Sequence, residues 1–225
     1  MSKVIIVRHG QASLGKANYD ELSKKGVNQA NLLGQYLKRH YQEPCSILAG
    51  TLTRHKQTAL EIMKAYPNAL ELKLDSDWNE FDFKKLISLY LKLHPHETPK
   101  TGDIRAFFSI LKKSMLAWSK DCLDYQSIDL ESWDMFSKRV NRALSKVTDH
   151  DMHGPQIIVS SGGVIAITLM RVLETSPNTM IDLNFQIRNT SYTELLIKPN
   201  RLNLIAFNQV NHLLETGDES LLSYA

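Results

Sequence analysis

Cysteine is scarce in this sequence. Only Cys45 and Cys122 occur among the 225 residues, too few and too far apart for a disulfide framework or a zinc site. We therefore expect both thiols to be reduced.

Long hydrophobic runs and clustered charge are also missing. No apolar stretch approaches the ~20 residues that span a bilayer, and the first apolar segment ends at Arg8, too early for a signal-peptide core. The 27 Lys and Arg residues are spread among 24 Asp and Glu residues, for a net charge of +3. Because the basic residues are not clustered, the sequence argues against a basic surface that binds nucleic acid and against a polybasic membrane anchor. We expect a cytoplasmic protein that binds neither nucleic acid nor membranes, and a small anionic substrate suits the slight positive charge.

What the sequence does contain is an alternation of strand and helix signals. Short apolar segments predict strands at residues 4–7, 46–49, 70–74 and 156–159, and three more near the C-terminus at residues 181–187, 191–197 and 202–207. A turn at residues 199–201 would join antiparallel neighbours. This pattern predicts a single α/β domain over residues 1–225, with a mostly parallel sheet that is mixed at one edge.

Amphipathic stripes predict the helices between these strands, with Ser23 as the N-cap of the first. The apolar positions at helical spacing are Val27, Ala30, Leu33 and Leu37; Leu52, Ala59, Ile62, Met63 and Tyr66; Ile104, Phe107, Phe108, Leu111, Met115 and Trp118; and Trp133, Phe136, Val140, Leu144 and Val147. We expect these side chains to form the core rather than a cofactor site.

The first predicted strand runs directly into Arg8, His9 and Gly10. Because α/β folds bind ligands at the carboxyl edge of the sheet, a guanidinium group and an imidazole at this point suggest phosphoryl transfer with a nucleophilic histidine. The tripeptide alone is equally compatible with a solvated Arg8, a surface His9 and a turn at Gly10.

Three other polar segments follow predicted strands. Residues 50–59 place Arg54 in the first turn of a helix, residues 78–81 contain Glu80, and residues 160–163 form a Ser-Ser-Gly-Gly junction between a strand and a helix. Since each segment lies just past an apolar run, we expect all of them to converge on one rim of the sheet.

In this order, the segments resemble the histidine phosphatase superfamily, also called the phosphoglycerate mutase-like family. Residues 22–30, 189–191 and 207–213 extend the resemblance over most of the chain. It is specific to the superfamily and not to a substrate. It implies a three-layer α/β/α sandwich, with a helical insertion at about residues 82–129 that covers the active site and selects the substrate.

The resemblance implies that His9 attacks phosphorus and becomes phosphorylated, while Arg8 and Arg54 bind the non-bridging oxygens. A neutral imidazole is a competent nucleophile near neutral pH, and guanidinium groups bind phosphate oxygens in bidentate fashion. Glu80 is the implied general acid, which later activates water, and Asp82 is the less favoured alternative. Aromatic neighbours would raise the pKa of Glu80 by desolvation.

One position departs from the family pattern. The fourth segment usually has a second histidine before its glycine, and Ser161 stands there in this chain. The Ser161 hydroxyl and the Gly162 amide at a helix N-terminus can donate hydrogen bonds to phosphate, but they supply no imidazolium charge. Removal of one such donor costs other enzymes about 3 kcal/mol of transition-state stabilisation. We therefore expect Ser161 and Gly162 to bind phosphate and turnover to be weaker, unless the substrate brings its own cation.

Other histidines could fill this gap. His55 follows Arg54 directly, but the next residue of a helix points about a quarter-turn away. The remaining histidines lie in predicted helix ends, in loops or near the chain end, and they are His40, His94, His96, His150, His153 and His212. For all of these, including His55, we favour a solvated or capping role.

Three polar residues near the nucleophile complete the candidate site. Gln11 and Ser13 follow Gly10 in a turn and are expected as secondary phosphate contacts. Asn18 lies in the loop before the first predicted helix and is a weaker candidate.

The sequence thus predicts a metal-independent phosphomonoester hydrolase that acts through a phosphohistidine on His9, on a small phosphorylated molecule. A mutase is less favoured because it needs a densely basic pocket protected from water. A non-enzymatic phospholigand-binding scaffold is the competing class, and Ser161 is its support. An acyl or sulfuryl hydrolase with Ser161 as nucleophile is least favoured, because Val159 stands where a nucleophile elbow requires glycine. No feature of the sequence indicates an oligomeric state.

Overall fold

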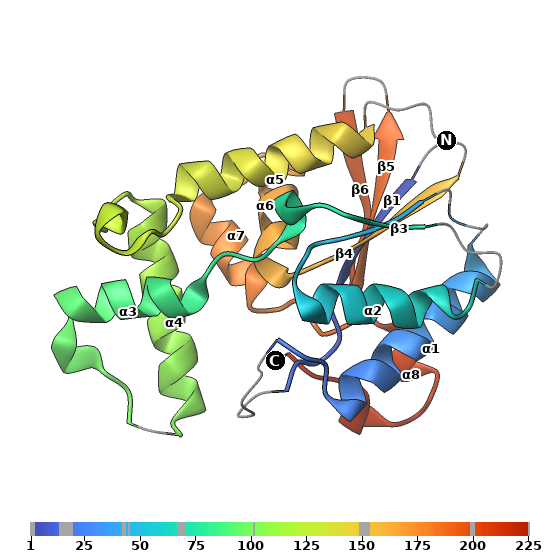
Figure 1. Cartoon of the computed structure of the whole chain (residues 1–225), viewed down its shortest axis with the longest axis horizontal. Coiled ribbons are helices and arrows are strands. Elements are labelled where there is room, and N and C mark those ends of the chain that lie inside the picture. Colours follow the sequence, from blue (N-terminus) through green and yellow to red (C-terminus); the bar gives the residue numbers. More distant parts are fainter. Residues whose placement is uncertain are drawn as a thin grey trace.

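A mixed six-stranded sheet forms the centre of the molecule, with strand order β3-β2-β4-β1-β5-β6 (Figure 1). The strands are β1 (Lys3–Arg8), β2 (Ser46–Ala49), β3 (Leu72–Leu74), β4 (Pro155–Ser160), β5 (Tyr192–Lys198) and β6 (Arg201–Gln209). Strands β1 to β4 pair in parallel, and β5 pairs antiparallel with β1 and β6. The predicted α/β class, with a mostly parallel sheet and an antiparallel edge, is confirmed.

This computed structural model describes residues 3–13, 20–41, 44, 46–66, 71–100, 102–148, 154–198 and 201–224. Cys45, Asn18, His150, His153 and the Pro199-Asn200 part of the predicted turn lie outside these residues. Cys122 has a free, exposed thiol. Among the described helices, none combines the length and the apolar composition needed to cross a membrane.

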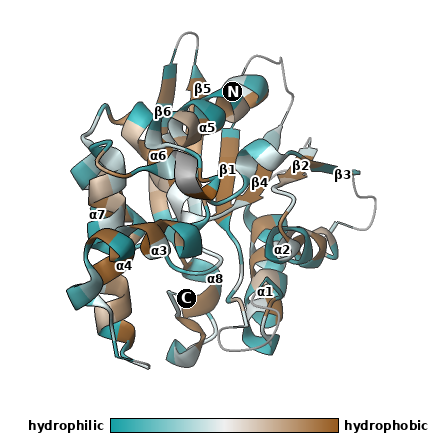
Figure 2. Ribbon diagram, turned by 60° about the vertical axis from the view of Figure 1, so that its left-hand side comes forward, coloured by the Kyte–Doolittle hydropathy of each residue, from teal (hydrophilic) through white to brown (hydrophobic). Residues whose placement is uncertain are grey.

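Helices cover both faces of the sheet and complete the three layers. They are α1 (Lys24–His40), α2 (Thr53–Met63), α3 (Phe83–Leu93), α4 (Ile104–Ser119), α5 (Trp133–Thr148), α6 (Gly162–Val172), α7 (Pro177–Asn184) and α8 (Asn211–Leu214). Alternation along β1 explains the layers, because Ile5 and Val7 pack among residues of α1 and α2, whereas Val4 and Ile6 pack on the side of α5, α6 and α7. Figure 2 shows the hydrophobic character of β1 between these helices.

Helices α3 and α4 project beyond the sheet, at the left of Figure 1. An aromatic cluster ties them to the rest of the molecule, since Trp118 of α4 stacks on Phe136 of α5 with ring centroids 5.6 Å apart. Phe81 lies 4.9 Å from Trp118 and follows a short 3-10 turn, η1 (Ser76–Trp78). Helix α4 and the segment around Glu80 therefore share one core.

Three sequence predictions about this framework are wrong. Residues 181–187 do not form a strand, because α7 begins at Pro177 and continues to Asn184. The Ser176 hydroxyl caps this helix by accepting a hydrogen bond from the Thr179 amide at 3.3 Å, and proline is favoured in the first helical turn. Ile104 is 69% exposed and Val27 is 38% exposed. These two residues occupy the edges of their apolar stripes and lie outside the core.

Candidate active site

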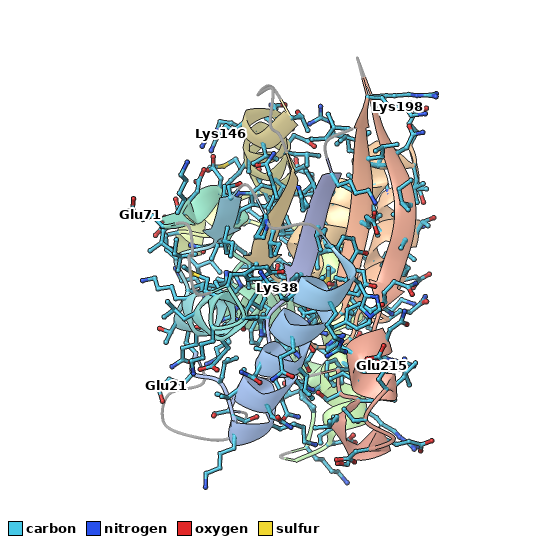
Figure 3. The ribbon with its side chains drawn as sticks, turned by 90° about the vertical axis from the view of Figure 1, so that its right-hand side faces the viewer. Glu21, Lys38, Glu71, Lys146, Lys198 and Glu215 are labelled. Atoms are coloured by element: carbon cyan, nitrogen blue, oxygen red, sulfur yellow. The ribbon has the colours of Figure 1, made fainter. Side chains whose placement is uncertain are left out.

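A cavity of about 640 Å³ opens at the carboxyl edge of the sheet. Five predicted site residues line it: Arg8 ends β1, His9 follows it, Arg54 lies in the first turn of α2, Glu80 follows η1, and Gly162 begins α6. The structure therefore brings together residues that are separated by up to about 150 positions in sequence. The opposite edge lies at the top of Figure 3, where Lys198 ends the antiparallel strand β5.

Both ring nitrogens of His9 have hydrogen-bond partners. Nδ1 lies 2.7 Å from the carbonyl oxygen of Gly10, which can only accept, so Nδ1 carries the proton. Nε2 accepts a hydrogen bond from Nε of Arg54 at 3.2 Å. Burial, with Arg54 and Arg8 adding to it, lowers the pKa of His9 well below its ordinary value of 6.5. The imidazole is thus neutral near pH 7, and its lone pair is on Nε2.

Two guanidinium groups place positive charge beside His9. Nη1 of Arg54 forms an ion pair with Oδ1 of Asp20 at 2.6 Å, and Oδ2 of Asp20 accepts a hydrogen bond from the Thr53 amide at 2.7 Å. Nη1 of Arg8 donates to the carbonyl oxygen of Ile187. Asp20, which no motif in the sequence marks, therefore orients Arg54 from the segment before α1.

Glu80 is held by backbone amides. Oε2 accepts a hydrogen bond from the Gly163 amide at 3.0 Å, and Oε1 accepts one from the Phe81 amide at 3.2 Å. Burial raises the pKa of Glu80 above its ordinary value of 4.5, although the Gly163 hydrogen bond and the charge of Arg54 oppose this rise. A Cβ atom on residue 163 would lie 2.2 Å from Oε1 of Glu80, so only glycine permits this approach. Asp82, the alternative acid, is exposed and caps α3 by accepting from the Lys85 amide at 3.0 Å.

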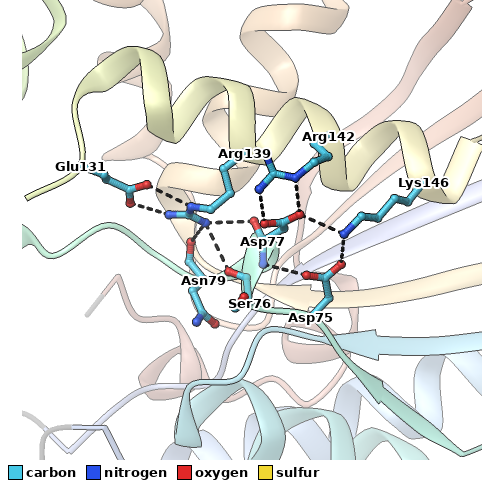
Figure 4. A network of polar contacts seen from close by, with 8 residues as sticks. All are labelled: Asp75, Ser76, Asp77, Asn79, Glu131, Arg139, Arg142 and Lys146. Carbon is cyan, nitrogen blue, oxygen red and sulfur yellow. Dashed lines mark hydrogen bonds and ion pairs between the residues drawn. The ribbon is translucent and has the colours of Figure 1, made fainter.

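A polar network fixes the segment before Glu80 to α5 (Figure 4). Nη1 of Arg139 donates to the carbonyl oxygens of Asp77 and Asn79 at 3.0 and 2.8 Å. The Asp77 carboxylate accepts from Arg142 at 2.6 and 2.9 Å and from Lys146 at 3.0 Å. The hydrogen bonds from Arg142, more than those from Lys146, lower the pKa of Asp77. The backbone that leads into Glu80 is thus anchored from outside the cavity.

Ser161 is 1% exposed and does not line the cavity. Its Oγ lies 2.6 Å from Nε2 of His55, and the ring centroids of His55 and His9 are 5.6 Å apart. Burial, with Arg54 adding to it, lowers the pKa of His55 well below its ordinary value of 6.5. Room for His55 exists because residue 50 is glycine, where a Cβ atom would lie 2.2 Å from Nδ1.

The predicted solvated or capping role is wrong for His55 and for His212. The buried face of α2 is wide and includes positions 54, 55, 58, 59 and 62, so Arg54 and His55 both point inward. His212 is 2% exposed, and its Nε2 lies 2.9 Å from the Thr190 hydroxyl. His40 and His96 are exposed.

Gln11 and Ser13 are not among the residues that line the cavity. Oε1 of Gln11 accepts a hydrogen bond from the Ser23 hydroxyl at 2.9 Å, and the Ser13 amide donates to the carbonyl oxygen of Glu21 at 2.8 Å. The structure thus places both residues at the entry to α1. Within the described ranges, no three His, Cys, Asp or Glu side chains are grouped as a metal site.

Comparison with known proteins identifies relatives along nearly the whole chain. The family model for the histidine phosphatase superfamily (branch 1) matches residues 4–210. A metal-independent phosphoserine phosphatase from Arabidopsis thaliana is 24% identical over 225 residues, covering 96% of this chain and 85% of that protein.

Solved structures have the same fold. A mutant phosphoserine phosphatase from Entamoeba histolytica in complex with phosphoserine is 25% identical, with a TM-score of 0.66, and the match covers 95% of this chain and all of that one. A phosphoglycerate mutase from Bacillus anthracis is 18% identical, with a TM-score of 0.65, and the match covers 96% of this chain and 97% of the other.

Proposed function

Because this chain belongs to the histidine phosphatase superfamily, we propose that it hydrolyses phosphomonoesters through a phosphohistidine on His9. The observation that supports this most is the hydrogen bonding of the His9 ring. The protonated Nδ1 donates to the carbonyl oxygen of Gly10, and Nε2, which carries the lone pair, accepts a hydrogen bond from Nε of Arg54. The phosphatase names of the Arabidopsis and Entamoeba relatives support phosphatase activity. Their substrate, phosphoserine, is one candidate for the small phosphorylated molecule that this chain would bind.

The first step transfers the phosphoryl group to His9. Nε2 attacks phosphorus, the bond between phosphorus and the ester oxygen breaks, and protonated Glu80 gives its proton to the leaving oxygen. Arg8 and Arg54 bind the non-bridging oxygens and stabilise the charge that they carry in the transition state. The products of this step are phosphohistidine and a free alcohol or phenol.

The second step returns the enzyme to its starting state. The Glu80 carboxylate takes a proton from water, the water oxygen attacks phosphorus, and the bond between phosphorus and Nε2 breaks. Inorganic phosphate leaves, and His9 regains its lone pair. In this scheme residues 1–225 act as one domain, and the helical insertion at about residues 82–129 covers the site.

The experiment compares the native chain with His9→Ala on p-nitrophenyl phosphate, with exposed His96→Ala as the matched control. We expect His9→Ala to lose activity by about 10⁴-fold or more and His96→Ala to keep it. Label from ³²P-substrate should remain on the native protein after quenching in alkali and be lost in acid, as expected of a phosphorus–nitrogen bond. Hydrolysis that does not need His9 would refute the mechanism, and phosphate binding without turnover would favour the scaffold alternative.

A further inference from the structure

The wall of the cavity beyond the phosphate-binding end is largely aromatic, although Ser109 and Asn184 also line it. Phe83 of α3 meets Phe107 of α4 edge to face at 6.5 Å, Phe107 lies 5.5 Å from Phe108, and Phe108 meets Phe185 at the end of α7 at 6.2 Å. These four rings are only half-buried and line the cavity, together with Phe81 and Leu111. Half-buried rings that line one concavity are typical of a site that an apolar ligand covers.

Charge at this end of the cavity is neutralised. Among the described lining residues outside the phosphate end, the charged side chains are Lys112 and Asp182, and they form an ion pair with each other at 2.6 Å. Both are about half exposed, which makes the pair weak and leaves no net charge. A substrate with an ammonium and a carboxylate group in this space would lose the hydration of both groups and gain only weak ionic interactions in exchange.

We infer, building on the proposed function, that the substrate is a phosphomonoester whose leaving group is aromatic or bulky and apolar. The phosphate would lie between Arg8 and Arg54, and the apolar group would cover the rings of α3, α4 and α7. The cavity volume of about 640 Å³ lies within the range of pockets that hold ligands as large as drugs, so it has room for a bulky leaving group. A compact zwitterion such as phosphoserine would leave the rings uncovered.

The experiment compares three alkyl esters, namely 2-phenylethyl phosphate, ethyl phosphate and O-phosphoserine. All three release an alkyl alcohol, so leaving-group reactivity differs less among them than between alkyl and aryl esters. We expect kcat/KM for 2-phenylethyl phosphate to exceed that for ethyl phosphate by about tenfold or more. Phe108→Ala should remove most of this preference, because it should lower kcat/KM for 2-phenylethyl phosphate much more than kcat/KM for ethyl phosphate. Ile104→Ala is the matched control, because Ile104 lies on the same helix, is exposed and does not line the cavity.

Equal rates for ethyl and 2-phenylethyl phosphate would overturn the inference, and so would a preference for phosphoserine that Lys112→Met abolishes. Calorimetric binding of the same esters to His9→Ala separates the two proposals. Tighter binding of 2-phenylethyl phosphate without native turnover would leave the inference standing while the proposed hydrolysis fails. If the native protein hydrolysed the three esters without selectivity in rate or binding, the proposed hydrolysis would stand and the inference about the leaving group would fail.

A second inference rests on the buried pair of His55 and Ser161. Nδ1 of His55 is buried and has no hydrogen-bond partner in the part of the chain that the structure describes. A proton on Nδ1 would be an unsatisfied buried donor, which is rare in proteins. With the proton on Nε2 instead, His55 donates to Oγ of Ser161 across 2.6 Å.

Ser161 is the N-cap residue of α6, but its hydroxyl does not cap the helix. The Gly163 amide, which such a cap could bind, donates to Glu80 instead. If Nε2 of His55 donates to Oγ, the Ser161 hydroxyl hydrogen remains available. The next residue, Gly162, lines the cavity, and the ring centroid of His55 lies 5.6 Å from that of His9, so the Ser161 hydroxyl lies beside the phosphate end of the cavity.

The geometry points to His55 as a positioning residue that holds Ser161 as a hydrogen-bond donor to the phosphate. The test is a double-mutant cycle of His55→Phe and Ser161→Ala, with kcat/KM on p-nitrophenyl phosphate and calorimetric binding of inorganic phosphate as readouts. We expect each single variant to lower kcat/KM about tenfold or more and the double variant to resemble Ser161→Ala. If His55→Phe lowered kcat/KM by the same factor in the native protein and in Ser161→Ala, the inference would be overturned, because the role of His55 would then be structural.

His55→Gln provides a second variant that keeps an N–H donor. We expect it to retain more phosphate affinity than His55→Phe at equal thermal stability. If the two bind phosphate equally, the donor role of His55 is refuted. Phosphate binding is measured without turnover, so this result does not depend on the proposed hydrolysis.

Discussion

The two ends of the active-site cavity are built from different parts of the molecule. The phosphate end consists of polar side chains at strand ends and first helical turns, and backbone groups hold them: the Gly10 carbonyl holds His9, and the Gly163 amide holds Glu80. The other end consists of half-buried phenylalanines on α3, α4 and α7. Main-chain hydrogen bonds at a sheet edge tolerate little change, whereas helix side chains can be exchanged without disturbing the sheet. Under the proposed function, the chemistry and the choice of substrate would thereby be separated.

The largest effect that can test this separation is expected from Arg54. Arg54→Met should lower kcat/KM about 10³-fold for every ester, because it removes positive charge from beside the transferring phosphoryl group and removes the guanidinium partner of the Asp20 carboxylate. Arg54→Lys keeps the charge without the planar fork and should lose less. The exposed Arg105→Met on α4 is the control. A loss that varied strongly with the leaving group would contradict the separation of the two ends.

Glu80→Gln should lower kcat/KM about 10²- to 10³-fold for alkyl phosphates. The first step should be slowed less with p-nitrophenyl phosphate, whose leaving group departs without a proton.

The proposed scheme also predicts a pH dependence, because it needs neutral His9 and protonated Glu80. The pKa of His9 is lowered below 6.5, and the pKa of Glu80 is raised above 4.5. Activity should therefore fall as the pH drops through the lowered pKa of His9 and as it rises through the raised pKa of Glu80. A pH profile of kcat/KM checks this, and Glu80→Gln should lose the alkaline limb.

Gly163→Ala should lower kcat/KM about tenfold, because its Cβ atom would lie 2.2 Å from Oε1 of Glu80 and displace the carboxyl group. The double variant with Glu80→Gln serves as the control. If Gly163→Ala acts through Glu80, it should add little further loss in that background. An undiminished loss there would mean that the substitution disturbs α6 instead.

The smallest catalytic effect is expected from Asp77→Asn, outside the cavity (Figure 4). Loss of the contacts with Arg142 and Lys146 should lower Tm by roughly 2–4 °C at neutral pH and change kcat/KM little. The pKa of Asp77 is lowered in the folded state, so its contribution is present above its ordinary value of 3.8 and lost as the pH falls through the lowered value. Thermal melts of both proteins should therefore converge in acid. A Tm difference that persisted in acid would contradict this account.

Short-range patterns in the sequence predicted most of the framework correctly. The ends of β1, β2 and β4 were predictable because apolar residues stop where polar motif residues begin. The prediction failed at α7, where Ile181 and Ile187 suggest a strand but Ser176 and Pro177 begin a helix. Local capping outweighed an apolar alternation that is compatible with either structure.

Pairings between distant residues had no local signal. Asp20 is 34 positions from Arg54, and Arg139 is 60 positions from the Asn79 carbonyl that it binds. The burial of His55 depends on Gly50 and on the place of Ser161 at the start of α6. None of these partners can be recognised until the chain has folded.

The sequence by itself determined the superfamily, the strand and helix pattern, and the presence of an imidazole, two guanidinium groups and a carboxyl group at predicted strand and helix ends. These features are local, because hydrophobic periodicity and glycine turns act over a few residues. Only the tertiary structure decided that Ser161 pairs with His55 and that phenylalanines from three helices line one cavity. Those outcomes depend on which distant surfaces pack together, and packing is a property of the whole fold.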